Sequence, residues 1–251
     1  MMLSNNQIKK YSSLKNKKYR EKYGLFIIER YKMIEEVLKS DYEIEAIIIS
    51  EDFLQEYKAL PSDLLFETSQ SNLAKISSMK TVPDILAILK KKNKTTTELP
   101  KGATILIDNI QNPGNLGTII RTAHWFGIQN IVCSKDSVDI YNEKVLQASM
   151  GAFFKMNVSY QDLNQLIPEL QKQNRKILGA FLEGESVYDY KFSEDDVFVL
   201  GNEGKGISSE IEKLIDKKIT IPTPLKDNKT ESLNIAIAGA VVCAERARQL
   251  I

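Results

Sequence analysis

The sequence predicts two α/β domains, of which the second is built on a parallel β-sheet. Helical patterns alternate with short β-branched apolar runs along most of the chain, and beyond residue 103 these runs become continuously apolar. Between the two halves, the stretch KKKNKTTTELPKG has no apolar periodicity and ends in Pro and Gly, which is typical of a linker. We therefore expect a domain at residues 1–90, a linker at 91–102 and a domain at 103–251.

The first domain is predicted to be a small α/β/α unit. It opens with a basic helix over residues 5–22, followed by a short apolar run at 26–28. Helices and β-branched runs then alternate, as expected for such a unit. We expect helices at 31–39 and 71–78, and strands at 44–50, 64–67 and 85–89.

The second domain is predicted to hold a parallel sheet covered by helices on both faces. Its strands are short and apolar throughout, which is typical of strands buried on both sides. We expect strands at 104–107, 130–133, 155–159, 177–181, 197–200 and 218–221, and helices at 114–126, 142–150, 161–173, 208–215 and 232–250. Ligands bind such sheets at the carboxyl ends of the strands, so a site is expected in the loops there.

Composition restricts the possible function classes. No apolar stretch is long enough to span a membrane, and the N-terminus MMLSNNQIKK lacks a secretory signal. Cys133 and Cys243 lie far apart and there is a single histidine, so neither a disulfide framework nor a His/Cys metal site is expected. The sequence therefore predicts a cytoplasmic protein without a metal or a membrane anchor.

Positive charge is concentrated near the N-terminus. The net charge of the chain is +1, but residues 1–32 contain nine Lys and Arg against two Glu, a net +7. Four tyrosines are interleaved with these bases, a pattern that suits RNA phosphates and unpaired bases. The alternative is a solvated helix that keeps the protein soluble. The candidate RNA-binding residues are Lys9, Lys10, Lys17, Lys18, Arg20 and Arg30.

Three loops at expected strand ends carry unusual residues. The first, NPGNLGTIIR, places Asn115 and Arg121 where a strand passes into a helix, and its Pro and Gly residues allow a tight turn. The second, GNEGKG at 201–206, has three glycines in six positions and matches neither the P-loop nor the dinucleotide fingerprint. Taken singly, each loop has an ordinary explanation. The first could be the start of a capped helix that carries a surface arginine, and the second could be a turn that merely closes a loop.

The third loop contains Ile221-Pro222 and, ten residues later, Ser232-Leu233-Asn234. An Ala- and Gly-rich helix follows, whose small residues permit close backbone approach. Here the ordinary explanation is that Ser232 is the N-cap of that helix.

Together the three loops resemble the three motifs of the SpoU (TrmH-type) branch of the SPOUT RNA ribose 2′-O-methyltransferases. Their order and spacing agree over residues 104–251, and the first 90 residues resemble, more loosely, the small RNA-binding domain of rRNA-modifying members. The resemblance implies a C-terminal trefoil knot, S-adenosylmethionine as the methyl donor and a homodimer with its catalytic pocket at the subunit interface. The family's donor-binding positions fall on Gly201, Asn202, Gly206, Ile221 and Leu233.

The resemblance also implies a catalytic set of Arg121, Asn115, Glu203, Ser232 and Asn234. A guanidinium stays protonated at ordinary pH, so we expect Arg121 to hold a phosphate and stabilise negative charge on the ribose oxygen, not to act as a base. Ser232 and Asn234 are expected to position the ribose. Asn115 and Glu203 are expected to fix both Arg121 and the loop.

The predicted function is therefore ribose 2′-O-methylation of large-subunit rRNA. A tRNA methyltransferase of the same branch, an antibiotic-resistance methyltransferase acting on rRNA, and a non-catalytic RNA-binding or ribosome-assembly factor remain alternatives. Members that modify tRNA typically carry short basic extensions, whereas this chain has a folded N-terminal domain, which favours rRNA. His124, a lone histidine beside two aromatic residues, is more typical of a packed or surface residue than of a base.

Overall fold

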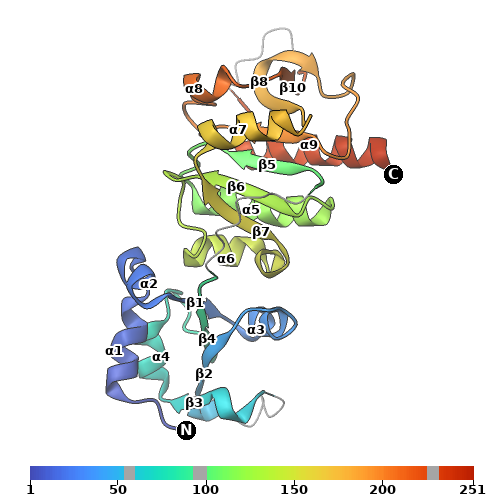
Figure 1. Ribbon diagram of the computed structural model, residues 1–251. Helices are drawn as coiled ribbons and strands as arrows, with labels where there is room; N and C mark the ends of the chain where they lie inside the picture. The colour runs from blue at the N-terminus through green and yellow to red at the C-terminus, as the bar shows by residue number, and fades with distance from the viewer. Residues whose placement is uncertain (54–59, 93–100, 225–231) are drawn as a thin grey trace. The chain divides into compact units, whose positions relative to one another are not determined.

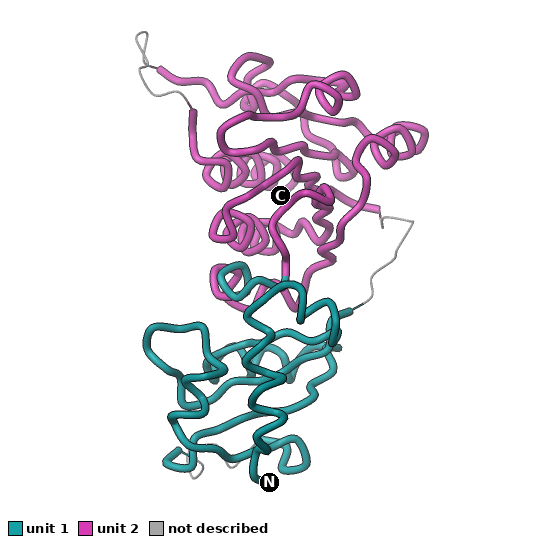
Figure 2. Tube along the Cα trace, turned by 90° about the vertical axis from the view of Figure 1, so that its left-hand side faces the viewer, with its two compact units in different colours: residues 1–93, 141–146 teal, residues 94–140, 147–251 magenta. Residues whose placement is uncertain are grey.

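The computed structural model describes residues 1–53, 60–92, 101–224 and 232–251 (Figure 1). The chain divides into two compact units, residues 1–93 with 141–146 and residues 94–140 with 147–251 (Figure 2). Each unit has its own sheet and its own hydrophobic core. Most of the expected linker, residues 93–100, lies outside the described residues.

The first unit is built on a four-stranded mixed sheet in the order β1-β4-β2-β3. Strands β2 and β3 are parallel, whereas β4 is antiparallel to both β1 and β2. Helices α1 and α4 pack against apolar residues of this sheet in one core. The elements are β1 (Leu25–Glu29), β2 (Ile44–Ser50), β3 (Leu65–Thr68), β4 (Ile85–Lys90), α1 (Asn5–Ser13), α2 (Lys17–Tyr23), α3 (Tyr31–Leu38), η2 (Ser62–Leu64) and α4 (Gln70–Ile76).

The single helix predicted over 5–22 is wrong, because the chain turns a corner between α1 and α2. Asn16 caps α2 by accepting a hydrogen bond from a backbone N–H, which favours a new helix start. Inside the corner, the buried Arg20 donates from Nη1 to the carbonyls of Leu14 and Lys15, both at 2.9 Å. These bonds satisfy the end of α1 and fix the corner.

The second unit holds a six-stranded sheet in the order β10-β8-β9-β5-β6-β7, parallel throughout as predicted. Helices α5 and α9 pack on each other, while α7 and α8 contribute to a core with the central strands (Figure 1). The strands are β5 (Thr104–Ile107), β6 (Asn130–Ser134), β7 (Asn157–Gln161), β8 (Ile177–Ser186), β9 (Val197–Leu200) and β10 (Lys217–Thr220). The helices are α5 (Pro113–Trp125), η3 (Ala152–Lys155), α7 (Leu163–Lys172), α8 (Ser209–Glu212) and α9 (Ile235–Leu250). Helix α6 (Glu143–Ser149) is divided, since its residues 143–146 group with the first unit and 147–149 with the second.

A buried guanidinium fastens the beginning of the second unit to its sheet. Arg175 is 6% exposed and donates from Nη2 to the Gly102 carbonyl at 2.5 Å and to Oγ1 of Thr104 at 2.7 Å. Its Nε donates to the Asp195 carbonyl at 3.1 Å. One side chain thus joins the residues before β5 to the residues before β9.

Replacing this side chain should destabilise the second unit. Arg175→Met leaves two carbonyls and a hydroxyl without their donor, and we expect the free energy of unfolding to fall by about 2–4 kcal/mol. Urea denaturation measures the change. The matched control is Lys176→Met, because Lys176 is exposed. Equal effects of the two substitutions would contradict the anchoring role.

Candidate active site

Two neighbouring strands deliver the first two loops to the same edge of the sheet. In the parallel pair β5 and β9, Ile107 lies opposite Leu200, so the loops that begin at Asp108 and Gly201 start side by side. Asp108 N donates to the Leu200 carbonyl at 2.8 Å. The structure therefore places two of the unusual loops at the carboxyl end of the sheet, where ligands bind such folds.

The Gly201–Gly206 loop is a tight turn stabilised by Asn202. The backbones of Asn202 and Gly206 exchange two hydrogen bonds, at 2.8 and 2.9 Å, and Asn202 Oδ1 accepts from the N–H groups of Gly204 and Lys205. A Cβ on Gly201 would lie 2.2 Å from the backbone of Gly206 and Ile207, so only glycine fits there. This turn closes the loop and brings Glu203 back toward β5.

Glu203 is the acceptor that joins this turn to the first loop. Its Oε1 accepts from the backbone N–H of Asn112 at 3.0 Å and from Nδ2 of Asn115 at 3.1 Å. Its Oε2 accepts from the backbone N–H of Gln111 at 3.3 Å. A second bridge runs alongside, because Nδ2 of Asn202 donates to the Asn109 carbonyl at 2.8 Å.

The hydrogen bonds to Glu203 favour its charged form. Burial opposes ionisation and is the largest single influence, but hydrogen bonds from its own backbone, the Asn115 amide and the N–H groups of Asn112 and Gln111 together outweigh it and lower the pKa of Glu203. The carboxylate is therefore ionised at neutral pH and bonded to three donors of the first loop.

Asn234 brings in the third loop. Its Nδ2 donates to Oδ1 of Asn115 at 3.0 Å, while its own Oδ1 accepts from the N–H groups of Ala236 and Ile237. Asn234 is thus the N-cap of α9, and the prediction that Ser232 begins this helix is wrong. Hydrogen bonds thus link Glu203, Asn115 and Asn234 in series, and this Glu203–Asn115–Asn234 chain connects all three loops. In the sequence, Asn115 lies 88 residues before Glu203 and 119 residues before Asn234.

Arg121 lies on α5 with its side chain exposed. Within the described part of the chain it makes no hydrogen bond or ion pair, so the expectation that Asn115 and Glu203 fix it is not met. Those two side chains hold the loop instead. The guanidinium is accordingly available to a ligand.

The remaining expected residues border the same loops. Ser232 and Leu233 are exposed just before α9, and Ile221 is half-buried directly after β10. Leu233 keeps 50% of its surface exposed, which is high for a leucine. Residues 225–231, between Ile221 and Ser232, lie outside the described residues.

Sequence reasoning did not single out Asp108 and Asn112, although both belong to the site. Asp108 is 7% exposed, and its Oδ2 accepts the backbone N–H of Ser208 at 2.8 Å. Asn112 caps α5 by accepting from the N–H groups of Gly114 and Asn115. The available signal was their position, since Asp108 directly follows β5 and Asn112 lies in the same loop, at a carboxyl strand end that was expected to border the site.

The expected RNA-binding residues divide into three groups. Lys9, Lys17, Lys18 and Arg30 are exposed. Lys10 forms an ion pair with Glu45 at 2.9 Å. Arg20 is 3% exposed and fully engaged inside the α1–α2 corner, so it is withdrawn from the RNA-binding set.

The other titratable candidates show no special environment. His124 is exposed on α5, and burial raises the pKa of both thiols, Cys133 and Cys243, to about 12. Among residues 1–53, 60–92, 101–224 and 232–251, no three His, Cys, Asp or Glu side chains form a group suited to a metal ion. No helix in those ranges is long and apolar enough to cross a membrane.

Comparison with known proteins supports the same identification. The SpoU rRNA Methylase family matches residues 102–244, and the MRM3-like substrate binding domain matches residues 5–87. The 23S rRNA (guanosine(2553)-2′-O)-methyltransferase RlmP of Bacillus subtilis is 29% identical over 95% of this chain and 94% of its own length. The 23S rRNA (uridine(2479)-2′-O)-methyltransferase of Streptomyces viridochromogenes is 25% identical, over 77% of this chain and 67% of its own.

Solved structures agree in fold. A TrmH-family protein from Porphyromonas gingivalis superposes with a TM-score of 0.90 at 34% identity, covering 99% of this chain and 100% of that one. AviRb from Streptomyces viridochromogenes in complex with AdoMet has a TM-score of 0.86 at 19% identity, with 98% of each chain covered. Since the first family match spans more than half of the residues and the three loops meet in one site, the chain belongs to the SpoU rRNA methylase family.

Proposed function

We propose that this protein transfers a methyl group from S-adenosylmethionine to a ribose 2′-hydroxyl in large-subunit rRNA. The observation that carries the proposal is the Glu203–Asn115–Asn234 chain, which brings the residues of all three family motifs to one edge of the sheet. The match of an rRNA methylase family and of a substrate-binding domain supports an RNA substrate. The 23S rRNA specificity of RlmP, which aligns over nearly its whole length, favours rRNA over tRNA.

The methyl donor would be held by backbone around Gly201, Asn202, Gly206, Ile221 and Leu233. The Gly206 position suits a close ligand, since it has a φ of +70° and a Cβ there would meet no atom within 4 Å. S-adenosylmethionine supplies an electrophilic sulfonium methyl. The proposal includes a trefoil knot in the second unit, as the family resemblance implies.

Arg121 is assigned the electrostatic role. Its guanidinium remains protonated, so it cannot take the proton of the 2′-hydroxyl, but it can hold a neighbouring phosphate and stabilise charge developing on the ribose oxygen. Its exposure and its freedom from ion pairs in the described ranges support this assignment.

Ser232 and Asn234 are assigned different roles in positioning the ribose. Asn234 uses its oxygen on the α9 backbone and one N–H on Asn115, so it acts mainly as a positioning residue with a single amide hydrogen left over. The exposed Ser232 hydroxyl is then the better candidate for contact with the sugar. Holding both groups still matters, since displacement at a methyl group requires the reacting atoms to be aligned.

The active form is proposed to be a homodimer formed through the second unit. Helices α5 and α9 pack together and carry the exposed apolar side chains of Trp125 (83% exposed) and Ile237 (53%), and Leu233, just before α9, is 50% exposed. Large exposed apolar residues on neighbouring helices are typical of an interface. We propose that a second copy of this chain covers them.

Arg121→Ala should abolish methyl transfer while leaving donor affinity within a few-fold. The loss removes an electrostatic contribution to the transition state, and roughly a hundredfold to a thousandfold decrease in kcat is typical of such groups. The assay follows labelled methyl groups from S-adenosylmethionine into total RNA, and calorimetry measures donor binding. A large drop in donor affinity would contradict the assigned role, and absence of label in any RNA with the wild-type protein would overturn the proposed function.

Glu203→Gln should lower methyl transfer at pH 7.5 by roughly tenfold or more, because the amide keeps one acceptor oxygen but replaces the other, and with it the negative charge, by an NH2 donor that cannot accept from the N–H groups of the first loop. The depressed pKa means that Glu203 stabilises the folded protein above its unfolded-state pKa and loses this contribution as pH falls through the folded-state pKa. The stability difference between wild type and variant, measured by urea denaturation, should therefore shrink on acidification from pH 6 to pH 3. A constant difference would contradict the linkage.

Trp125→Glu combined with Ile237→Glu should convert the protein to a monomer. Two buried carboxylates in an apolar interface would lack partners, which weakens association strongly. Analytical ultracentrifugation reports the mass. Leu38→Glu, on an exposed residue of α3, is the control that should leave the mass unchanged. A variant that stays dimeric would place the interface elsewhere.

A further inference from the structure

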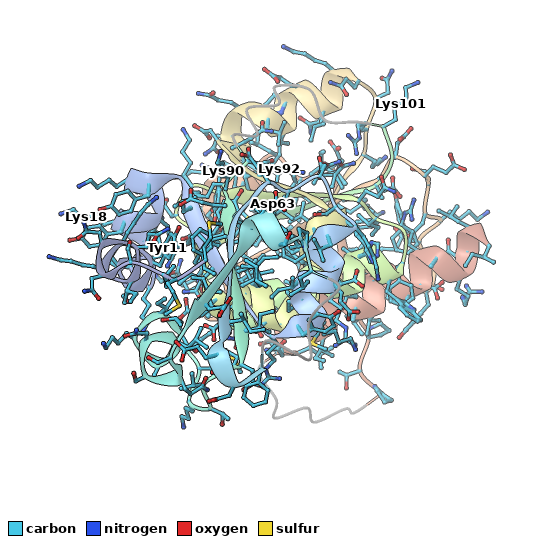
Figure 3. The ribbon with its side chains drawn as sticks, turned by 90° about the horizontal axis from the view of Figure 1, so that it is seen from below. Tyr11, Lys18, Asp63, Lys90, Lys92 and Lys101 are labelled. Carbon is cyan, nitrogen blue, oxygen red and sulfur yellow. The ribbon has the colours of Figure 1, made fainter. Side chains whose placement is uncertain are left out.

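Helix α2 carries two parallel stripes on its solvent side, one of rings and one of cations. Tyr19 and Tyr23 are four residues apart and stack with ring centroids 6.2 Å apart and an interplanar angle of 17°. Lys18 and Lys22 have the same spacing one position earlier, so they form the adjacent stripe. Figure 3 shows Lys18 extending away from this helix.

None of these four side chains is fully buried, although Tyr19 is half-buried. Tyr23 is 37% exposed, and both lysines are exposed. Within the residues that the structure describes, neither lysine forms an ion pair and neither phenol hydroxyl forms a hydrogen bond. Among the described residues, the rings stack on each other, and two cations lie above Tyr23, with Nζ of Lys22 at 5.4 Å from the ring centroid and Nζ of Lys10 at 5.7 Å.

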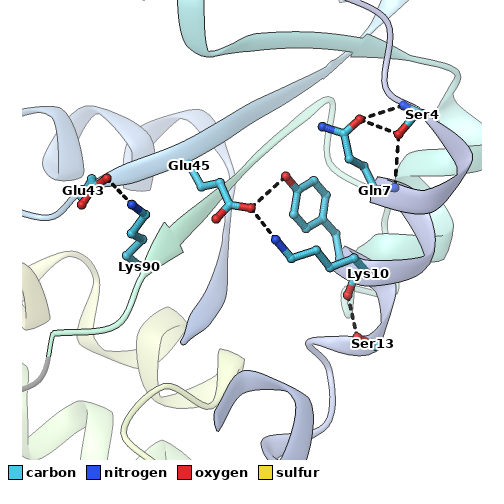
Figure 4. Close-up of polar contacts among 8 residues, drawn as sticks. Ser4, Gln7, Lys10, Ser13, Glu43, Glu45 and Lys90 are labelled. Carbon is cyan, nitrogen blue, oxygen red and sulfur yellow. Dashed lines mark hydrogen bonds and ion pairs between the residues drawn. The ribbon is translucent and has the colours of Figure 1, made fainter. Parts of the chain in front are cut away.

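On the neighbouring helix α1, a lysine and a tyrosine both have a hydrogen-bonding partner within the described part of the protein, in contrast to those of α2. Glu45 accepts from Nζ of Lys10 at 2.9 Å and from the hydroxyl of Tyr11 at 3.1 Å (Figure 4). Burial and the Glu45 carboxylate raise the pKa of Tyr11 to about 12. The charge of Lys10 is thereby paired with Glu45, unlike the charges of Lys18 and Lys22 among the described residues.

The α2 face formed by Tyr19, Tyr23, Lys18 and Lys22, called the platform below, is held in place at both ends of the helix. Arg20, on the inner side of α2, bonds to the last carbonyls before the corner, and Asn16 caps the first turn. Gly24, with a φ of +64°, ends the helix directly after Tyr23. A surface held in this way loses little conformational entropy when it binds.

We propose that this face of α2 binds an unpaired nucleotide of the RNA substrate, with a base stacked on the tyrosine stripe and the flanking phosphates on Lys18 and Lys22. Aromatic rings stack with any base, and lysine ammonium groups neutralise phosphates, so together they recognise single-stranded RNA. A base displaces the Lys22 ammonium from the ring, and that ammonium then pairs with phosphate. The inference rests on the proposed function, since it adds a contact for the RNA that the second unit would methylate.

Two probes separate stacking from charge. One is a short fluorescein-labelled oligoadenylate RNA, and the other is an abasic oligomer of equal length and charge, both measured by fluorescence anisotropy with the full chain. Tyr23→Leu should weaken binding of oligoadenylate roughly 5- to 100-fold and abolish its advantage over the abasic oligomer. Tyr23→Phe, which keeps the ring, should bind within about twofold of wild type.

The lysines are tested by salt dependence. Lys18→Ala combined with Lys22→Ala should reduce the slope of log affinity against log salt concentration by about 1.4, because each phosphate contact on a single strand contributes about 0.7. Tyr23→Leu should leave this slope unchanged. Lys39→Ala, which removes an exposed positive charge directly after α3 that pairs with Glu36, is the control and should leave the slope at its wild-type value.

The outcomes distinguish this inference from the proposed function. If wild type methylates RNA but Tyr23→Leu and the double lysine variant bind both oligomers as wild type does, the platform is wrong and the function stands. If the variants lose binding as stated but wild type methylates no RNA, the platform stands and the function fails. In the methylation assay, Tyr23→Leu should raise KM for RNA and leave kcat unchanged; a lower kcat with unchanged KM would contradict a binding role.

Discussion

The site depends on one carboxylate that accepts more hydrogen bonds than a surface glutamate normally does. Glu203 lies on a turn that only glycine at position 201 allows, and it bonds to donors that follow a neighbouring strand. Without an ionised acceptor at this point, the backbone N–H groups of Gln111 and Asn112 and the side-chain amide of Asn115 would lack this hydrogen-bond partner. Parallel strands bring the loops to one edge, but the carboxylate is what joins them.

Much of the fold follows from the sequence, because the strands of a buried parallel sheet are apolar at every position. The apolar runs around Ile105 and Val199 therefore predicted β5 and β9 with the bounds that the structure has. Local polar bonds were harder to foresee. The α1–α2 corner depends on Asn16 as a cap and on Arg20 as an internal donor, and in a basic, helix-forming stretch both residues look like part of one continuous exposed helix.

The composition of the site was predictable, but the partner of each residue was not. Motif order identified Asn115, Glu203 and Asn234 as members, and the structure joins all three. Which atoms meet depends on loop conformation, and that is why Arg121 was expected to be held by Asn115 and Glu203 but makes no bond to another described residue. The same limit applies to Asn234, whose capping bonds to α9 only the backbone geometry could reveal.

The long separation between Asn115 and Asn234 has a consequence during synthesis. At about 5–20 residues per second, the ribosome adds the later asparagine roughly 6–24 s after the earlier one, so a nascent chain holds the first loop well before the third exists. During that interval α5 lacks the α9 surface on which it packs. Translation that stops just short of α9 would therefore release a polypeptide with all six strands of the sheet and no complete site.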